Sequence, residues 1–438
     1  MSALGDAMAL TAPQYGMWAA QQLDPDSPSL WTAEAVELRG ELDTEALLRA
    51  IAEGLGACDA LHMRYREEDG RVTQRLDPRR AVPVQRLDFS LGAQGRMLAY
   101  SWMQQDLQAR ADLAEGPLFA TALIRLGPGH HLWYLRAHHV ALDGFAYLLL
   151  IKRVAQLYSA QCAGAEAPAA RDWSLQAVVQ DDAAYRASSA RERDREFWRE
   201  RLATMGPAVS LAPPRPPAAS ARSCRQRLPL QDYARWQVAA RACEVDWVAW
   251  LLAAIAAWMH RASGARELSL GLLAMNRLGG KALGVPCMAM NVVPLRIVVD
   301  PDASFARLAA DVAAELRALR PHLRYNYEDL RQDAGIAGTH AQLYGPVVNL
   351  MPFDRAFAFA GLGSRALPVS VGAVEDLDIT VSPLADGIRF DIEANPDAYA
   401  APRLRALHAG LLQVVEAAID DPGRRIADLP ADAAMEAA

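Results

Sequence analysis

The sequence is poor in cysteine, with five cysteines in 438 residues. They are widely spaced, their number is odd, and no two of them form a Cys-x-x-Cys pair. This pattern fits neither a disulfide scaffold nor a zinc site. We therefore expect a protein of a reducing compartment whose fold depends on an apolar core.

The sequence also lacks a long hydrophobic run and a basic block. The longest apolar run extends from Trp247 to Met259, whereas a membrane-spanning helix needs about 20 residues. The first 17 residues contain no lysine or arginine, which is not the pattern of a secretory signal. Lysine and arginine total 45 against 52 acidic residues, and the net charge is -7. These features predict a soluble, cytoplasmic protein that binds neither membranes nor nucleic acid.

What is present is the composition of an ordinary globular protein, with 52% apolar and 22% charged residues. A chain of this length is expected to form two domains of roughly 200 residues. Strand-like clusters alternate with long amphipathic helices in both halves, which indicates an α/β or α+β layered fold. Prolines between Pro207 and Pro217 predict an extended surface crossover. We place the domain boundary between residues 165 and 190.

The periodicity of apolar residues predicts the individual elements. Strands are expected at residues 35–40, 61–66, 72–76, 82–87, 118–126, 131–138, 267–273, 290–299, 346–351, 366–371, 376–384 and 387–393. Helices are expected after Asp43, at 94–109, from Phe145 to before Gly164, and at 191–202, 230–243, 247–262, 304–320 and 402–418.

The most informative motif is His138-His139-x-x-x-Asp143-Gly144, which lies where a predicted strand ends and a helix begins. Successive side chains of a strand point to opposite faces, so only one of the two histidines is expected to face a substrate. A base beside free backbone N–H groups is what acyl transfer requires. Asp143 also has an ordinary explanation, because aspartate is a common helix N-cap.

The same geometry argues against a metal site. Adjacent histidines are poor joint ligands, and no third ligand lies at a familiar spacing. We predict that this protein binds no metal ion at the motif.

Further motifs accompany this one in a fixed order. They are Leu10-Thr-Ala-Pro-Gln-Tyr-Gly-Met-Trp18, Gln22-Leu-Asp-Pro-Asp-Ser-Pro28, Ala60-Leu-His-Met-Arg-Tyr65, Arg195-Glu-Phe-Trp198, Gly271-Leu-Leu-Ala-Met-Asn-Arg277, Asn291-Val-Val-Pro-Leu-Arg296, His322-x-Arg324-Tyr325-x-x-Glu328-Asp-Leu330 and Tyr344-Gly-Pro-Val-Val-Asn349. From about residue 10 to residue 425 the chain resembles condensation domains of nonribosomal peptide synthetases, in the chloramphenicol acetyltransferase-like superfamily. Within that family it looks most like the siderophore-synthetase branch of enterobactin synthetase component F.

The resemblance implies a fold of two chloramphenicol acetyltransferase-like subdomains in a V-shaped pseudo-dimer. The N-terminal subdomain, with the paired histidines, would comprise residues 1–175, and the C-terminal subdomain residues 176–425. Residues 426–438 would form an exit linker.

The resemblance also implies the reaction and the partners. The α-amine of a carrier-bound aminoacyl group would attack a carrier-bound acyl thioester, aryl groups included, in the biosynthesis of a siderophore, an antibiotic or another peptide. Phosphopantetheine arms would arrive on the carriers, so no cofactor is bound permanently. The region around Met1 looks like a natural start, which implies a donor carrier in trans. An acceptor carrier and an adenylation domain would follow the exit segment.

By the same resemblance, His139 would bind the incoming amine and relay its proton, with His138 in a supporting role. The N–H of Gly144 would stabilise the oxyanion.

Asp143 would hold the loop by pairing with Arg277, and this pair would bridge the two halves of the chain. Asn349 would line the acceptor side. The segment Cys58-Asp-Ala-Leu-His62 departs from the usual His-Glu-x-Leu-Arg pattern, so the role of that arginine does not transfer to His62.

Two alternatives remain open. A free-standing acyltransferase that uses a soluble amine or alcohol would carry the same paired histidines. A catalytically silent module that only docks carriers belongs to a different class, and such modules typically lose the catalytic histidine. The acyl group, the amino acid, the donor stereochemistry, the oligomeric state and the opening between the halves do not follow from the sequence.

Overall fold

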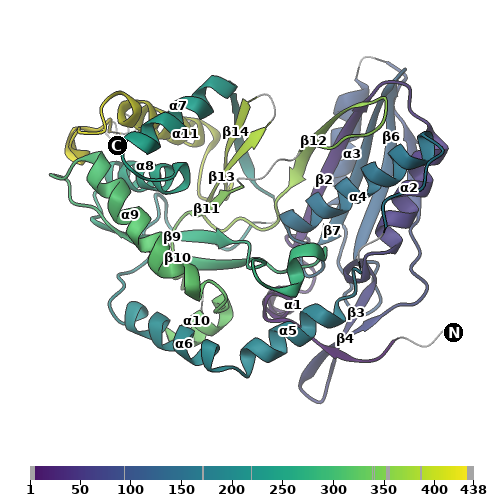
Figure 1. Cartoon of the computed structure of the whole chain (residues 1–438), viewed down its shortest axis with the longest axis horizontal. Helices are drawn as coiled ribbons and strands as arrows, with labels where there is room; N and C mark the ends of the chain where they lie inside the picture. Colours follow the sequence, from purple (N-terminus) through teal and green to yellow (C-terminus); the bar gives the residue numbers. More distant parts are fainter. Residues whose placement is uncertain are drawn as a thin grey trace. The chain divides into compact units, whose positions relative to one another are not determined.

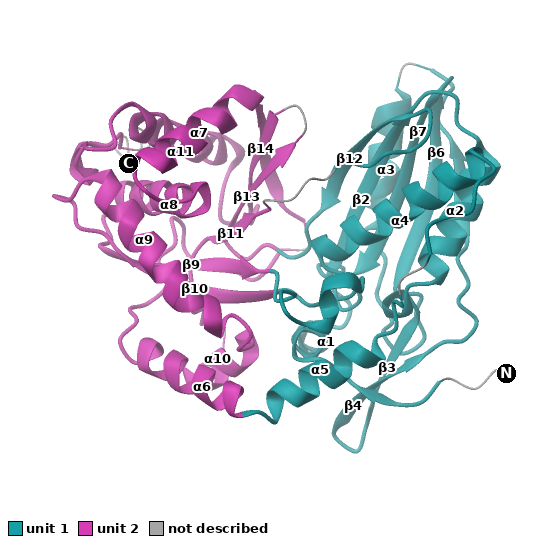
Figure 2. Cartoon of the chain, viewed as in Figure 1, with its two compact units in different colours: residues 1–188, 275–290, 355–373 teal, residues 189–274, 291–354, 374–438 magenta. Residues whose placement is uncertain are grey.

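The computed structural model describes residues 5–431, with gaps at 93, 170–171, 219, 338, 340, 352–355 and 385–386. The chain forms two compact units, each assembled from separate segments (Figure 2). Unit 1 comprises residues 1–188, 275–290 and 355–373, and unit 2 comprises residues 189–274, 291–354 and 374–438.

The division of the chain is therefore more complex than a single boundary at residue 175. The first break falls after Ser188, within the expected stretch 165–190. Two later segments, 275–290 and 355–373, belong to unit 1 although the sequence placed them in the second subdomain. Long-range strand pairing and side-chain contacts hold these segments, and local periodicity carries no signal for either. Residues 432–438 of the expected exit linker lie outside the described residues.

Unit 1 is built on a five-stranded sheet in the order β12-β2-β7-β6-β5. Its strands are β2 (Trp31–Arg39), β5 (Val84–Asp88), β6 (Phe119–Gly127), β7 (His130–His138) and β12 (Gly363–Ser370). Neighbouring strands are antiparallel except β5 and β6. A smaller sheet contains β1 (Met8–Ala9), β3 (Met63–Glu68) and β4 (Arg71–Leu76).

The helices of unit 1 begin where the sequence supplies caps. They are α1 (Ala12–Leu23), α2 (Thr44–Gly56), α3 (Gly95–Asp106), α4 (Gly144–Cys162) and α5 (Gln176–Arg186), with 3-10 turns η1 (Asp59–His62) and η2 (Lys281–Gly284). Asp43 caps α2 and Asp143 caps α4, in each case by accepting a backbone N–H three residues on. Such a cap satisfies one of the donors that the first turn leaves free.

Helices α2 and α4 lie side by side over the large sheet of unit 1 (Figure 1). Gly54 lies so close to α4 that an added Cβ would come within 2.7 Å of Val154 Cγ2. On the other face, the Tyr134 ring of β7 packs edge-on against Trp102 of α3. Both faces of the central strands are thus covered, and α4 is fixed with its first residue at the end of β7.

Unit 2 contains a six-stranded sheet in the order β10-β9-β11-β13-β14-β8. Its strands are β8 (Arg222–Leu228), β9 (Glu267–Ala274), β10 (Asn291–Val298), β11 (Val347–Leu350), β13 (Leu377–Leu384) and β14 (Gly387–Ala394). Only β11 runs parallel to its neighbours β9 and β13.

The core of unit 2 is centred on α8, in which thirteen of seventeen residues are buried. The helices of this unit are α6 (Ser189–Leu202), α7 (Leu230–Ala242), α8 (Trp247–Ser263), α9 (Phe305–Leu319), α10 (Tyr327–Asp333) and α11 (Ala401–Asp420), with short turns η3 (Arg320–His322) and η4 (Ile426–Asp428). Across the described ranges, no single helix has the length and apolar character to span a bilayer. Only α7 and α8 together pass that test, and they meet at a 90° bend.

Every strand and helix expected from periodicity is present, with ends that differ by a few residues. Among the described residues, five helices and strands had no counterpart among the expected ones: β1, α1, α5, β8 and α10. Strand β8 reads Arg-Ser-Cys-Arg-Gln-Arg-Leu and lies at the edge of its sheet. A charged edge strand of this kind lacks the apolar alternation by which strands are recognised.

Candidate active site

The paired histidines lie where β7 ends and the chain turns into α4. Strand β7 ends at His138, and alternation places His138 on the same face as Tyr134 and Arg136. The backbone carbonyl of His138 then accepts the N–H groups of Ala141 and Leu142, which forms a tight turn. The strand therefore ends between the two histidines, so strand alternation alone does not separate their roles, and the hydrogen bonds of the two rings do.

His138 is completely buried. Its Nδ1 accepts the backbone N–H of Val140 at 3.1 Å, so the ring hydrogen is on Nε2, which donates to Gln21 Oε1 at 2.8 Å. The ring packs edge-on against Trp31, with 5.4 Å between ring centroids. Burial, together with the neighbouring His139, lowers the pKa of His138 to about 3. A neutral ring with both nitrogens engaged is a structural element, as expected for the supporting histidine.

His139 has the opposite tautomer. Its Nδ1 donates to the carbonyl oxygen of Leu142 at 2.9 Å, because a carbonyl can only accept. The lone pair is therefore on Nε2. Burial lowers the pKa of His139, although Asp143 and the Leu142 carbonyl act in the opposite direction. A neutral imidazole with a fixed ring and a free basic nitrogen can accept a proton at neutral pH.

Gly144 is the first residue of α4. A Cβ built at this glycine would meet no atom of the described residues within 4 Å, apart from its chain neighbours and its own helix. Its φ is not in the left-handed region, so the backbone conformation does not require glycine. The absence of a side chain instead leaves open space at the helix N-terminus, where backbone N–H groups favour negative charge.

Asp143 is fully buried, and its carboxylate accepts several hydrogen bonds. Its Oδ1 accepts the Ala146 N–H at 2.9 Å, and its Oδ2 accepts the N–H groups of Ala289 and Met290 at 3.0 and 3.1 Å. Arg277 Nη2 lies 2.8 Å from Oδ1 and 2.7 Å from Oδ2. With its oxygens engaged in this way, Asp143 is not arranged to act as a base.

The partner of Asp143 is equally enclosed, because the Arg277 side chain is also 0% exposed. Its guanidinium donates to the backbone carbonyls of Ala282, Val285 and Cys287. The Asp143–Arg277 pair predicted from the sequence is therefore present. Its expected position was wrong, because Arg277 lies in segment 275–290 of unit 1 and the pair does not bridge the two units.

Two other residues named from the sequence belong to other elements than this motif. Asn349 is on β11 of unit 2, opposite Thr380 of β13, and its role in substrate binding stays a prediction. His62 is buried in η1 and donates from Nε2 to the carbonyl oxygen of Leu55 at 3.1 Å. His62 thus has a structural partner of its own, and the role of the family's arginine does not transfer to it.

Sequence reasoning missed two residues that contact the histidines. Gln21 of α1 holds His138, as described above. Gly372 lies beside His139, since a Cβ on Gly372 would lie 3.5 Å from the His139 ring atom Cδ2. Gly372 also has a φ of +99°, a conformation that favours glycine. Its proximity to a motif more than 200 positions earlier arises from the tertiary structure alone.

In the part of the chain that the structure describes, no group of three or more His, Cys, Asp or Glu side chains could hold a metal ion. At the motif itself, both ring nitrogens of His138 and the Nδ1 of His139 already have hydrogen-bond partners.

A histidine pair in the turn before a helix, with one ring buried and the other partly buried, suits an acyltransferase-type site. The chain belongs to the condensation domain family, whose model matches residues 5–437. Condensation domains are amide-forming acyltransferases of nonribosomal peptide synthetases, and they work with carrier and adenylation domains.

Known proteins with similar sequences agree with this family. The chain is 37% identical over 413 residues to a dimodular nonribosomal peptide synthase of Bacillus subtilis, covering 93% of this chain and 17% of that protein. It is 37% identical over 430 residues to an isonitrile lipopeptide synthase of Streptomyces coeruleorubidus, covering 97% of this chain and 29% of that protein. It is 33% identical over 401 residues to enterobactin synthase component F of Escherichia coli O157:H7, covering 90% and 31% respectively. The chain thus spans less than a third of the length of these relatives.

Solved structures agree with this assignment. The first condensation domain of the calcium-dependent antibiotic synthetase, in complex with a substrate analogue, superimposes with a TM-score of 0.90 at 30% identity, covering 97% of this chain and 99% of that one. A variant of the starter condensation domain of rhizomide synthetase, in complex with C8-CoA and Leu-SNAC, gives 0.89 at 29% identity, with 97% and 96% covered. The mixed α/β, chloramphenicol acetyltransferase-like fold expected from the sequence is confirmed.

Proposed function

We propose that this protein forms an amide bond by attack of a carrier-bound aminoacyl α-amine on a carrier-bound acyl thioester. The observation that carries the proposal is the orientation of His139. Its Nδ1 donates to the Leu142 carbonyl, so the lone pair is on Nε2, in the turn between β7 and α4. Membership of the condensation domain family supports the same reaction.

The chemistry makes modest demands on the protein. An α-amine has a pKa of about 7.7–8.0, so a large fraction is already neutral near pH 8. The amine nitrogen attacks the thioester carbon, a C–N bond forms, and the carbonyl oxygen becomes an oxyanion. The C–S bond then breaks and the carrier thiol leaves, while the proton lost by the nitrogen passes through His139 Nε2 to the departing sulfur. The protein mainly aligns the two partners and stabilises the oxyanion.

We assign the oxyanion to the N-terminus of α4. The N–H of Gly144 belongs to the first turn of that helix, where free donors and the helix dipole favour negative charge. Asp143 contributes indirectly, because its contacts with Arg277 and with Ala146 fix the start of the helix. In this proposal Asn349, on β11, is a residue that binds the acceptor substrate.

The partners and substrates are also part of the proposal. Donor and acceptor carriers would each deliver a phosphopantetheine arm, with the donor carrier on another polypeptide and the acceptor carrier and an adenylation domain downstream. The names of the relatives include a siderophore synthase and a lipopeptide synthase. We therefore propose an acyl or aryl donor and a siderophore, lipopeptide or related peptide as the product.

Intact mass spectrometry of the carriers tests the reaction directly. An acceptor carrier loaded with an aminoacyl group is mixed with donor carriers loaded with aryl or fatty acyl groups, with and without this protein. We expect the acceptor carrier to gain the mass of one acyl group and the donor carrier to lose it. Transfer to a free amine or alcohol, with none to the loaded acceptor carrier, would instead support a free-standing acyltransferase. If neither acceptor reacted with any donor, a docking role would be favoured.

Gly144→Ala tests the assignment of the oxyanion site. The added methyl group would project into the open space at the start of α4, so we expect a loss of condensation rate of about 10²-fold from misplacement of the substrate. Stability should not fall, because alanine is a better helix former than glycine by about 1 kcal/mol. Rates with loaded carriers and thermal unfolding are measured together.

Gly127→Ala is the matched control. A Cβ at Gly127 also meets open space among the described residues, but Gly127 is at the end of β6, opposite the first residue of β7, whereas the motif begins at the last residue of that strand. Its rate should be unchanged. Equal rates in the Gly144→Ala and unsubstituted proteins would contradict the oxyanion assignment.

A further inference from the structure

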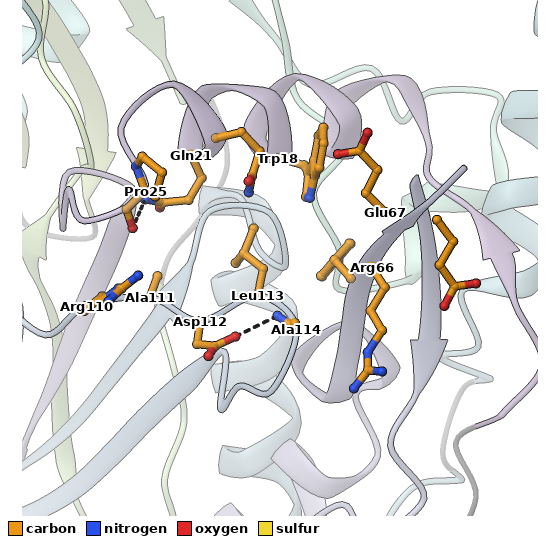
Figure 3. Close-up of a pocket in the computed structure, with 13 residues that line it drawn as sticks. Trp18, Gln21, Pro25, Arg66, Glu67, Arg110, Ala111, Asp112, Leu113 and Ala114 are labelled. Atoms are coloured by element: carbon orange, nitrogen blue, oxygen red, sulfur yellow. Dashed lines mark hydrogen bonds between the residues drawn. The ribbon is translucent and has the colours of Figure 1, made fainter. Parts of the chain in front are cut away.

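Gln21 of α1 is buried, with 3% of its surface exposed. Its Nε2 lies 2.9 Å from the carbonyl oxygen of Asp24, 3.3 Å from that of Pro25 and 3.1 Å from that of Ser27. Figure 3 shows Gln21 and Pro25 on the wall of a groove of about 510 Å³ on unit 1. Three carbonyls around one amide nitrogen fix the orientation of the side chain, because a flipped amide would place its oxygen against them.

This fixed orientation determines the state of His138. The Gln21 Oε1 must accept, so the hydrogen it receives at 2.8 Å is on His138 Nε2. His138 Nδ1 is then free to accept the N–H of Val140. The amide of Gln21 therefore selects the Nε2–H tautomer of His138. In that tautomer, His138 Nδ1 accepts the N–H of Val140, the residue that follows His139.

The turn continues to His139. Residues 138–142 are closed by the hydrogen bonds from Ala141 and Leu142 to the His138 carbonyl. The same turn presents the Leu142 carbonyl to His139 Nδ1. A continuous series of contacts thus runs from the Gln21 amide through the His138 ring and the turn to the ring that supplies the basic nitrogen.

We propose that Gln21 is a positioning residue of the condensation site, which fixes His138 as a neutral Nε2–H tautomer and thereby orients His139. The expected effect on kcat rests on the proposed function. The tautomers of His138 and His139 can be observed whether or not the protein catalyses condensation. A carboxylate at this position could accept from His138 but could not donate to the three carbonyls. The carboxamide is therefore suited both to hold the loop and to leave the histidine uncharged.

Few charged or titratable groups of the described residues act on the rings of His138 and His139. His139 is the titratable group that acts on His138, and Asp143 is the one that acts on His139. Arg136, on the same face of β7 as His138, has its guanidinium over the Trp31 ring at 4.2 Å. A negative charge introduced at position 21 would lie against His138 Nε2 and would favour its protonation.

The test compares Gln21→Glu with Gln22→Glu. Both substitutions add one negative charge to α1, but Gln22 is exposed. For Gln21→Glu we expect kcat to fall about 10- to 100-fold, with little change in KM for the loaded carriers and with an altered acid limb of the pH–rate profile. Gln22→Glu should behave like the unsubstituted protein. A folded Gln21→Glu protein with the kcat and pH profile of Gln22→Glu would overturn the proposal.

Nitrogen NMR of histidine-labelled protein provides a readout that needs no activity. In the unsubstituted protein we expect His138 as the neutral Nε2–H tautomer throughout pH 5–8, and His139 as the Nδ1–H tautomer at pH 8. Finding hydrogen on Nδ1 of His138 would overturn the inference even if Gln21→Glu did not fold. If the protein showed no condensation with any carrier pair, the proposed function would fail, but the NMR result would still test Gln21. Loss of the neutral Nε2–H tautomer of His138 in Gln21→Glu would support its positioning role, and an unchanged tautomer would contradict it.

Discussion

Replacement of His139 with alanine is expected to lower the rate of amide formation by about 10²- to 10⁴-fold, the range typical for removal of a positioned proton acceptor. The protein should remain folded, because the His139 side chain is only partly buried and the supporting contacts of the loop belong to His138 and Asp143. Rates are measured by mass spectrometry of loaded carriers at saturating concentrations, and folding by thermal unfolding.

The control for this substitution is His131→Ala. His131 lies near the start of β7, is also partly buried, and has a pKa lowered by burial. It shares these properties with His139 without being in the motif. We expect His131→Ala to retain the full rate. Full activity of His139→Ala would contradict the proposed role.

The same histidine determines the pH dependence. Burial lowers the pKa of His139 below its ordinary value of 6.5, so the neutral, proton-accepting form persists at lower pH than for an exposed histidine. His139 should therefore add an acid limb to kcat below pH 6.5 in the unsubstituted protein, besides the limb that protonation of the substrate amine causes near its pKa of about 7.7–8.0. Persistence of the lower limb in His139→Ala would show that another group causes it.

Removal of Arg277 is expected to lower the free energy of unfolding by about 3–5 kcal/mol, the usual cost of leaving one member of a buried ion pair uncompensated. In Arg277→Ala the carboxylate of Asp143 stays buried with only backbone donors, and the carbonyls of Ala282, Val285 and Cys287 lose their partner. Segment 275–290 should detach more readily from unit 1. Denaturant unfolding measures the loss, and hydrogen exchange locates it.

Arg66→Ala is the matched control in the same unit. Arg66 pairs with Glu115 at 2.7 Å, but the two side chains are 46% and 70% exposed. Exposed pairs contribute about 0–1 kcal/mol. An Arg277→Ala protein as stable as Arg66→Ala would show that the buried pair is not required to hold the segment.

Local features of the fold followed well from the sequence. Asp43 and Asp143 were each expected at a helix start, and each accepts a backbone N–H as an N-cap. The helix expected at residues 247–262 is present, and it forms the centre of the unit 2 core. Caps and periodicity are properties of neighbouring residues, so they can be recognised before the chain is folded.

Elements with weak local signals were missed. The charged helix α5 and the arginine-rich strand β8 have few buried residues, and α10 has only seven residues. Their places are determined by the partners against which they pack. Strand β8, for example, pairs along its full length with β14, which follows it by about 160 residues.

The sequence by itself determined the family, the paired-histidine motif and the partnership of Asp143 with Arg277, because these depend on residue types and order. Only the tertiary structure decided that His138 is the buried ring and His139 the one with a free Nε2. It also placed Arg277 in unit 1 and brought Gln21 to His138 and Gly372 to His139. The physical reason is that tautomers and ring orientations depend on hydrogen-bond partners distant in sequence. A motif specifies which groups are present, and the fold decides which partners they meet.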